Sequence, residues 1–345
     1  MSLPSLFNCS NDMALAANVR QYLPPKRIQQ METDLADLVR IWEGTRFAGP
    51  WGWSLATKQR YKQLGVEEEL LPSDEWIEEV RRLSSREFAC GYIRELLKEF
   101  QDDRLLGEGM AFCKDMSTLN SLPSTVNCQL SIVNCHLIFK SPWSSSGRGV
   151  FVDRITDGKC QMSTLKRLQG FLSSQGGFVV DRFYEDKVLD FAMEFFVNDD
   201  KSVDFLGYSV FHADPNGTYG YNYVESQEEL LQRIVDGNHG LNGQLGVDGC
   251  LLDRLIDYHK TYLSTLICQL STVNYHGPVG IDMLKTADGH MHPCLEINFR
   301  MNMGILALLL YEKYGSHATV ALTSPCPSGY RAMIEKGRLQ IVFRS

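Results

Sequence analysis

A β-hairpin pattern near the C-terminal end of the chain constrains its fold more than any other feature. Two runs, Val279–Lys285 and His290–Asn298, alternate apolar and polar residues on either side of Ala287-Asp288-Gly289. This alternation predicts two antiparallel strands, and the short glycine-containing segment between them predicts a tight turn. The chain is therefore expected to contain a sheet that packs one face on a core and presents a polar face on the other side.

Three polar residues of this hairpin form a candidate metal site. Glu296 and Asn298 are two positions apart, so both side chains project from one face of their strand, and Asp282 lies on the partner strand. Carboxylate and amide oxygens held on rigid strands are hard ligands that suit Mg²⁺ bound together with nucleotide phosphates. A divalent cation would also relieve the repulsion between the two carboxylates. The alternative is that these residues are solvated acids on an outward-facing strand.

The length of the turn decides whether the two acids share a face. A two-residue turn at Asp288-Gly289 would place Asp282 opposite Leu295, with Glu296 on the other face. A three-residue loop, with Gly289 in a left-handed conformation, would place Asp282 diagonally beside Glu296 on one face. Shared metal ligation therefore predicts the three-residue loop, or a bulge elsewhere in the hairpin.

A second pattern indicates a phosphate-binding loop. The apolar run Leu137–Phe139 predicts a strand that leads into Lys140, and the segment after it is rich in serine and glycine. Lysine would bind phosphate as a point charge, Arg148 would add a forked donor, and a flexible backbone could approach phosphate oxygens closely. The segment is neither a Walker loop nor a GxGxxG motif, and a linker or hairpin is the alternative. The candidate phosphate contacts are Lys140, Ser144, Ser145, Ser146, Gly147, Arg148 and Gly149.

A third pattern is the segment Val179–Tyr184, in which a predicted strand ends in an acid, Asp181. The end of such a strand can offer backbone N–H and C=O groups to an adenine edge, and a later carboxylate can bind ribose hydroxyls. Asp190 is the first choice for the ribose contact, with Glu185 and Glu194 as alternatives. An ordinary core strand with exposed acids is the competing interpretation.

The rest of the chain is expected to mix helices with short strands. Helices are predicted over Met13–Arg20, Trp76–Leu83 with Ser73 as N-cap, Arg86–Phe100, Thr164–Ser174 and Leu251–Leu270; strands over Gly177–Asp181, Asp190–Val197, Ser202–Phe211 and Tyr219–Val224; and an exposed break over Gly49–Trp53.

Composition excludes several classes of function. A length of 345 residues suits two or three subdomains, and a net charge of -8 argues against a nucleic-acid surface. The longest aliphatic run, Ile305–Tyr311, is far shorter than the roughly 20 residues that span a bilayer, and no signal-peptide pattern opens the chain. Ten cysteines without a CxxC pair predict free thiols in a reducing cytoplasm.

Taken in order, the lysine with its Ser/Gly-rich loop, the strand Val180–Phe183, Asp282 and the sequence Glu296-Ile297-Asn298-Phe299-Arg300 resemble the ATP-grasp superfamily over roughly residues 107–310. The resemblance implies an α+β, ATP-grasp-like fold in which a nucleotide is held between two α+β lobes, preceded by a mostly helical or α/β N-terminal domain. The implied boundaries are 1–106 for the N-terminal domain, 107–184 for the small ATP-binding lobe and 185–345 for the C-terminal lobe with the metal site.

The same resemblance assigns roles to individual residues. It implies that Lys114 is a further phosphate contact, that Asp181 and Phe183 frame adenine, and that Asp190 faces ribose. It places Mg²⁺, with Mn²⁺ as an alternative, on Asp282, Glu296 and Asn298. Catalysis would fall to Lys140, Arg148 and Arg300, with Arg300 contacting phosphate or the acyl intermediate.

The implied function is an ATP- and Mg²⁺-dependent ligase that joins a small-molecule carboxylate to an amine or thiol through an acylphosphate. A small-molecule kinase on the same scaffold and a non-catalytic nucleotide-binding protein are the alternatives. The sequence identifies neither the substrates nor an oligomeric state. Candidate substrate contacts are Arg300, Asn302, Tyr221, Tyr223, Asn8, Asn11, Asp12 and the Trp51–Trp53 loop.

Overall fold

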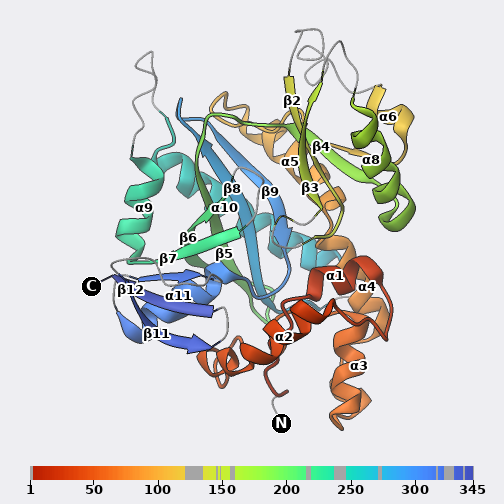
Figure 1. Cartoon of the computed structure of the whole chain (residues 1–345). Helices are drawn as coiled ribbons and strands as arrows, with labels where there is room; N and C mark the ends of the chain where they lie inside the picture. The colour runs from red at the N-terminus through yellow and green to blue at the C-terminus, as the bar shows by residue number, and fades with distance from the viewer. Residues whose placement is uncertain are drawn as a thin grey trace.

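Two antiparallel sheets and the helices around them form the chain in the computed structural model (Figure 1). The structure describes residues 3–120, 135–144, 147, 149–155, 160–214, 219–236, 246–270, 274–315, 318–321, 330–336 and 339–344. Everything below concerns these residues.

The N-terminal part of the chain is helical. Ser54, Ser73 and Ser85 each accept a backbone N–H at the start of the helix that follows them, which is the usual way to satisfy an unpaired amide there. The predicted helices after Ser73 and over Arg86–Phe100 are confirmed. The elements are α1 (Asn11–Ala17), α2 (Lys26–Asp34), the 3-10 helices Ala36–Ile41 and Glu68–Leu70, α3 (Leu55–Gln63), α4 (Asp74–Leu83) and α5 (Arg86–Phe100).

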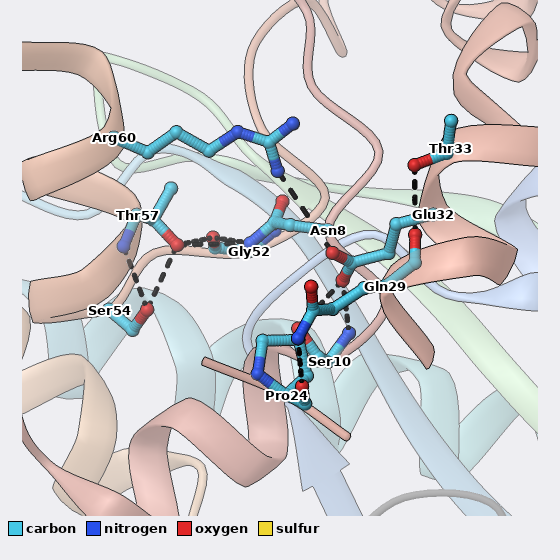
Figure 2. A network of polar contacts seen from close by, with 10 residues as sticks. All are labelled: Asn8, Ser10, Pro24, Gln29, Glu32, Thr33, Gly52, Ser54, Thr57 and Arg60. Atoms are coloured by element: carbon cyan, nitrogen blue, oxygen red, sulfur yellow. Dashed lines mark hydrogen bonds and ion pairs between the residues drawn. The ribbon is translucent and has the colours of Figure 1, made fainter. Parts of the chain in front are cut away.

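The first helix differs from its prediction. It begins at Asn11 and ends at Ala17, because Asn18 adopts a left-handed conformation with φ of 49°. Ser10 stands at the N-cap position, but its hydroxyl and its N–H both donate to the Glu32 carboxylate instead, at 2.6 and 3.0 Å (Figure 2).

The segment around Trp51 is buried, so the expectation of an exposed break there is wrong. Trp51 is 4% exposed and packs edge-on against Phe7, with ring centroids 5.1 Å apart. Asn8 donates to the Gly52 carbonyl and to the Thr57 hydroxyl, at 2.8 and 3.0 Å (Figure 2). These bonds satisfy the buried polar groups of the loop and hold it against the first residues of the chain.

The small sheet has the strand order β1-β4-β2-β3. Its strands are β1 (Ala111–Cys113), β2 (Cys135–Lys140), β3 (Val150–Ile155) and β4 (Phe178–Arg182), and the helices beside it are α6 (Met116–Asn120) and α8 (Met162–Gln175). Phe139, Phe151 and Phe178 pack with Leu168 of α8 in one apolar cluster. Phe139 and Lys140 are successive residues, so packing of the phenyl ring turns the lysine to the opposite face.

The large sheet has the order β11-β12-β10-β7-β6-β5-β8-β9. Its strands are β5 (Lys187–Val197), β6 (Val203–Ala213), β7 (Tyr219–Val224), β8 (Gly277–Thr286), β9 (Met291–Asn298), β10 (Ala318–Ala321), β11 (Tyr330–Lys336) and β12 (Leu339–Arg344), with α9 (Gln227–Val235), α10 (Gly249–Gln269) and α11 (Met303–Tyr314). Phe191, Met193 and Phe195 of β5 share a core with Leu255 and Leu263 of α10. The alternate residues of β5 therefore face the other side of the sheet, where the site lies.

Within the described residues, no helix combines the length and the apolar character that a membrane crossing requires.

Candidate nucleotide and metal site

A cavity of about 580 Å³ is lined by both sheets and by the N-terminal segment. Lys140 and Asp181 enter it from the small sheet, and Asp190, Glu194 and Asp282 enter it from the large sheet. Figure 1 shows the small sheet standing beside the β8–β9 end of the large one. Residues more than a hundred positions apart in the sequence thus share one cavity.

The β8–β9 hairpin brings the two predicted metal-binding acids together. The Thr286 amide donates to the His290 carbonyl at 3.0 Å, and Gly289 has φ of +87°, so the loop has three residues as predicted. A register shift follows, and Asp282 pairs directly with Glu296. The expected diagonal placement is therefore wrong in detail, because the shift moves Glu296 along its strand until the two acids are direct neighbours on one face.

The electrostatics of this pair fit a divalent cation. Burial and the Glu296 charge raise the pKa of Asp282 well above its usual value. Asn298 adds an amide whose nitrogen lies 3.3 Å from Asp282 Oδ2. No cluster of three or more His, Cys, Asp or Glu is arranged for a metal in the described parts of the chain, so the candidate set is two carboxylates and the Asn298 amide, whose oxygen accepts from Arg300 at 2.8 Å. Such a set of hard oxygens suits Mg²⁺, which usually takes few protein ligands and completes its shell with phosphates and water.

Arg86, which the sequence analysis missed, connects β9, the strand that carries Glu296, to the loop after β2. Its guanidinium pairs with the Glu296 carboxylate and also donates to the Ser141 carbonyl and the Ser144 hydroxyl, both at 2.8 Å. Burial is the largest single effect and would raise the pKa of Glu296, but the charges of Arg86, Arg300 and Lys140 and a hydrogen bond with Asp282 together lower it. The local pattern indicated only a helix start at Arg86, so no sequence signal pointed to these contacts.

Lys140 lies at the end of β2 and lines the cavity with 7% of its surface exposed. Burial lowers its pKa, while the Asp181 carboxylate opposes that effect. A buried ammonium beside a cavity is poised to bind an anion, because phosphate would replace the solvation that burial removed.

The loop after Lys140 is described only in part. Gly147 lines the cavity. Ser144 does not line it, and its hydroxyl oxygen accepts a hydrogen bond from Arg86. Gly149 has φ of +88°, and a Cβ at this position would come within 2.3 Å of Ser141 Oγ, so the glycine permits the tight return of the chain. Ser145, Ser146 and Arg148 lie outside the described residues.

Lys114 does not lie in the cavity. It follows β1, its side chain is 70% exposed, and its ammonium pairs with Glu87 at 3.0 Å. The expected second phosphate lysine is therefore not brought to the site in this conformation, because the end of β1 directs it toward α5 at the surface.

The strand that was predicted to contact adenine is present as β4, but the side chain of its acid is engaged within the protein. Asp181 is 1% exposed and accepts from His292 Nε2 at 3.1 Å and from the Arg182 amide at 2.7 Å. Its side chain therefore ties β4 to β9, while Phe183 and Tyr184 follow it along the cavity wall. The Asp181 side chain is thus engaged within the protein, and the Phe183 amide that follows it donates to the His136 carbonyl at 3.1 Å.

The three acids considered for ribose all line the cavity in different settings. Asp190 accepts from Lys187 at 2.6 Å, and burial raises its pKa. Glu185 is 66% exposed and pairs with His136. Glu194 is 1% exposed and lies deep in the floor of the cavity. Asp190 lies on the cavity face of β5, and its contact with ribose stays a prediction.

Glu194 belongs to a buried network that the sequence analysis did not predict. It accepts from the Ser209 hydroxyl and from the Asn302 amide, both at 2.8 Å. Burial raises its pKa to about 7, although both hydrogen bonds oppose the rise. Gly304 is required beside it, since a Cβ there would lie 2.1 Å from a Glu194 oxygen.

Arg300 reaches the cavity but is already paired. Its Nε and one terminal nitrogen donate to the two oxygens of Asp12, at 2.8 and 2.7 Å, across 288 positions of sequence. Of the other candidate substrate contacts, Asn302, Tyr223 and Trp51 line the cavity. Asn8, Asn11, Trp53 and Tyr221 do not line it.

No protein-family model matches the chain, and no curated protein matches it in sequence. Solved structures do resemble it. Pyruvate carboxylase from Rhizobium etli has a TM-score of 0.50 at 9% identity, covering 99% of this chain and 34% of its own. The biotin carboxylase domain of 2-oxoglutarate carboxylase from Hydrogenobacter thermophilus, in complex with MgADP, has a TM-score of 0.45 at 9% identity and 78% coverage of this chain. L-amino acid ligase from Bacillus licheniformis has a TM-score of 0.43 at 11% identity, covering 91% of this chain and 81% of its own.

The fold is therefore α+β and ATP-grasp-like, as the sequence predicted. This chain spans about a third of the pyruvate carboxylase chain and 63% of the 2-oxoglutarate carboxylase domain.

Proposed function

We propose that this chain is an ATP- and Mg²⁺-dependent ligase that joins a small-molecule carboxylate to an amine or thiol. The observation that carries the proposal is the meeting of Lys140 from the small sheet with Asp282, Glu296 and Asn298 from the large sheet in one cavity. A phosphate-binding cation facing a set of Mg²⁺ ligands across a cavity is the arrangement that a nucleotide between two lobes needs.

The proposed boundaries are 1–106 for the N-terminal domain, 107–184 for the small lobe and 185–345 for the metal-binding lobe. Adenine would lie against the backbone near Phe183, and ribose near Asp190. Asp282, Glu296 and Asn298 would hold Mg²⁺, which when bound neutralises charge on the phosphates. The role of Lys140 is to bind and orient the transferred phosphate.

The chemistry follows from charge neutralisation and alignment. A substrate carboxylate attacks the γ-phosphate, ADP leaves, and the resulting acylphosphate is captured by an amine or thiol with loss of phosphate. Lys140 stabilises the negative charge on the transferred group, while Arg86 keeps Glu296 ionised and in place. Arg148 is proposed as a further cation of the loop. No serine or cysteine nucleophile is needed for this sequence of steps.

Product analysis tests the reaction class. The purified chain is incubated with MgATP and pools of small carboxylates, amines and thiols, and ADP, free phosphate and phosphorylated products are measured. We expect ADP and phosphate in equal amounts, only when a carboxylate and an acceptor are both present. Phosphate retained on a single substrate would instead identify a kinase, and binding without turnover would identify a non-catalytic nucleotide-binding protein.

A further inference from the structure

The cavity has an apolar side that the nucleotide and metal sites do not use. We call it the apolar wall: Phe7, Met13, Ile28, Met31, Trp51 and Met303. All but Met303 come from the first 51 residues of the chain. Met13, Met31 and Met303 are only partly buried. Methionine adapts to the shape of what it contacts, which suits a wall that receives an apolar group.

The apolar wall is fixed to the chain directly after the metal strand. The Met301 amide donates to the Trp51 carbonyl at 2.9 Å, one residue beyond Arg300. Phe7 and Trp51 also share a core with Met301 and Ile305 at the start of α11. The apolar wall therefore packs against the segment that follows Asn298 and Arg300.

Arg300 has little capacity left for an anion. A guanidinium offers five N–H donors. Four are used: two on Asp12, one on the Asn298 side-chain oxygen at 2.8 Å and one on the Met301 carbonyl at 2.9 Å. With Asp12 bound at both oxygens, the charge of Arg300 is balanced, and a forked bond to a substrate carboxylate is excluded.

Glu194 is the acid at this end of the cavity that has no cation among its described hydrogen-bond partners. Asp12 and Asp282 both act electrostatically on Arg300, and Arg300 in turn acts on Glu194. Arg86, the next cation, is committed to Glu296. Arg300 is paired with Asp12, whereas the described hydrogen-bond partners of Glu194, Ser209 and Asn302, are both neutral. The local field therefore favours a cation over an anion beside the apolar wall.

We propose that the acceptor substrate is an apolar amine: its ammonium group approaches Glu194, and its hydrocarbon part lies on the apolar wall. This rests on the proposed ligase function, and it narrows the acceptor to amines that carry no carboxylate of their own. The amine must lose a proton before it attacks the acylphosphate, and the Glu194 carboxylate can accept that proton.

Three probes of one shape test the proposal: 3-methylbutylamine, 3-methylbutanol and 4-methylpentanoate. Binding to the full chain is measured by calorimetry with MgADP present. We expect the amine to bind about ten-fold more tightly than the alcohol, and the acid most weakly. Tighter binding of the acid, or equal binding of all three, overturns the proposal.

Two variants locate the binding. Asp12→Asn keeps the shape but releases the charge of Arg300, so the preference for amine over acid should fall by about ten-fold or reverse. Met31→Gln should weaken the amine and the alcohol together, whereas Met31→Leu should preserve both. An Asp12→Asn preference equal to that of the parent chain counts against the proposal.

Two controls distinguish a wrong acceptor proposal from a folding defect and from a failed nucleotide site. Glu194→Gln is a second charge variant, which should weaken amine binding without touching the Asp12–Arg300 pair. MgADP binding is measured in every sample without a probe. If MgADP binds but the amine shows no preference, the acceptor proposal is wrong; if MgADP itself does not bind, the ligase function is wrong.

Discussion

At the scale of single residues, Glu194 is the most unusual group in the cavity. A carboxyl that is 1% exposed is normally disfavoured as an anion, and here its partners are neutral, namely Ser209 and Asn302. Two glycines, Gly280 and Gly304, lie beside the Glu194 carboxylate. A Cβ at either position would clash with a Glu194 oxygen, and one at Gly280 would also clash with Asn302.

Glu194 predicts a definite pH dependence of stability. Its pKa in the folded chain is about 7, against 4.5 as the ordinary value, so the folded state binds the proton more tightly than the unfolded state. The free energy of unfolding should therefore fall as pH rises from about 5 to about 7, by about 3 kcal/mol at most. Glu194→Gln should remove most of this slope. Urea unfolding at several pH values measures it, and an unchanged slope in the variant would contradict the assignment.

At the scale of elements, the β8–β9 hairpin shows what the sequence can predict. The three-residue loop followed from the need to place Asp282 and Glu296 on one face, and local turn chemistry supports it. The register shift beyond the loop was not predicted, because a shift depends on packing against neighbouring strands that no local pattern records.

Long-range partners explain the other differences from the sequence analysis. Arg86 was expected only to begin a helix, and Asp12 was one of several loosely suggested substrate contacts. Their partners, Glu296 and Arg300, lie more than two hundred positions away. The order of motifs predicted the fold and the pairing of the strands that carry Asp282 and Glu296, whereas side-chain pairings across such distances depend on the packed structure.

Arg86 provides a prediction at this scale, because it joins α5, the loop after β2 and β9. Arg86→Met keeps the apolar stem but leaves Glu296 without a cation, so the chain should lose about 3 kcal/mol of unfolding free energy at neutral pH. The loss should shrink as pH falls and Glu296 becomes protonated.

Arg82→Met is the matched control for this prediction. Arg82 is 51% exposed in its pair with Glu79, so its loss should cost under about 1 kcal/mol. Denaturant unfolding of both variants measures the difference. Equal losses in the two variants would show that the Arg86–Glu296 pair has no special weight.

At the scale of the whole molecule, three separate parts of the chain meet at one cavity. The small sheet contributes Lys140, the large sheet contributes Asp282, and the N-terminal segment contributes Asp12 through its pair with Arg300. A ligand that touches all three would be bound by the assembled fold and by no single part of it. Binding should then be coupled to the stability of the entire chain.

That coupling gives the last prediction. MgATP at about a hundred times its Kd should add roughly 2.7 kcal/mol to the free energy of unfolding, because it binds only the folded chain. Lys140→Gln and Asp282→Asn should each abolish most of this gain, since each removes one side of the nucleotide site. Lys114→Gln should keep it, because Lys114 is 70% exposed and paired with Glu87 outside the cavity. Thermal unfolding with MgATP, ATP with chelator, and no ligand measures all three variants. A gain that survives in Asp282→Asn, or that disappears in Lys114→Gln, would mean that the nucleotide binds elsewhere or that the small lobe closes further than this structure shows.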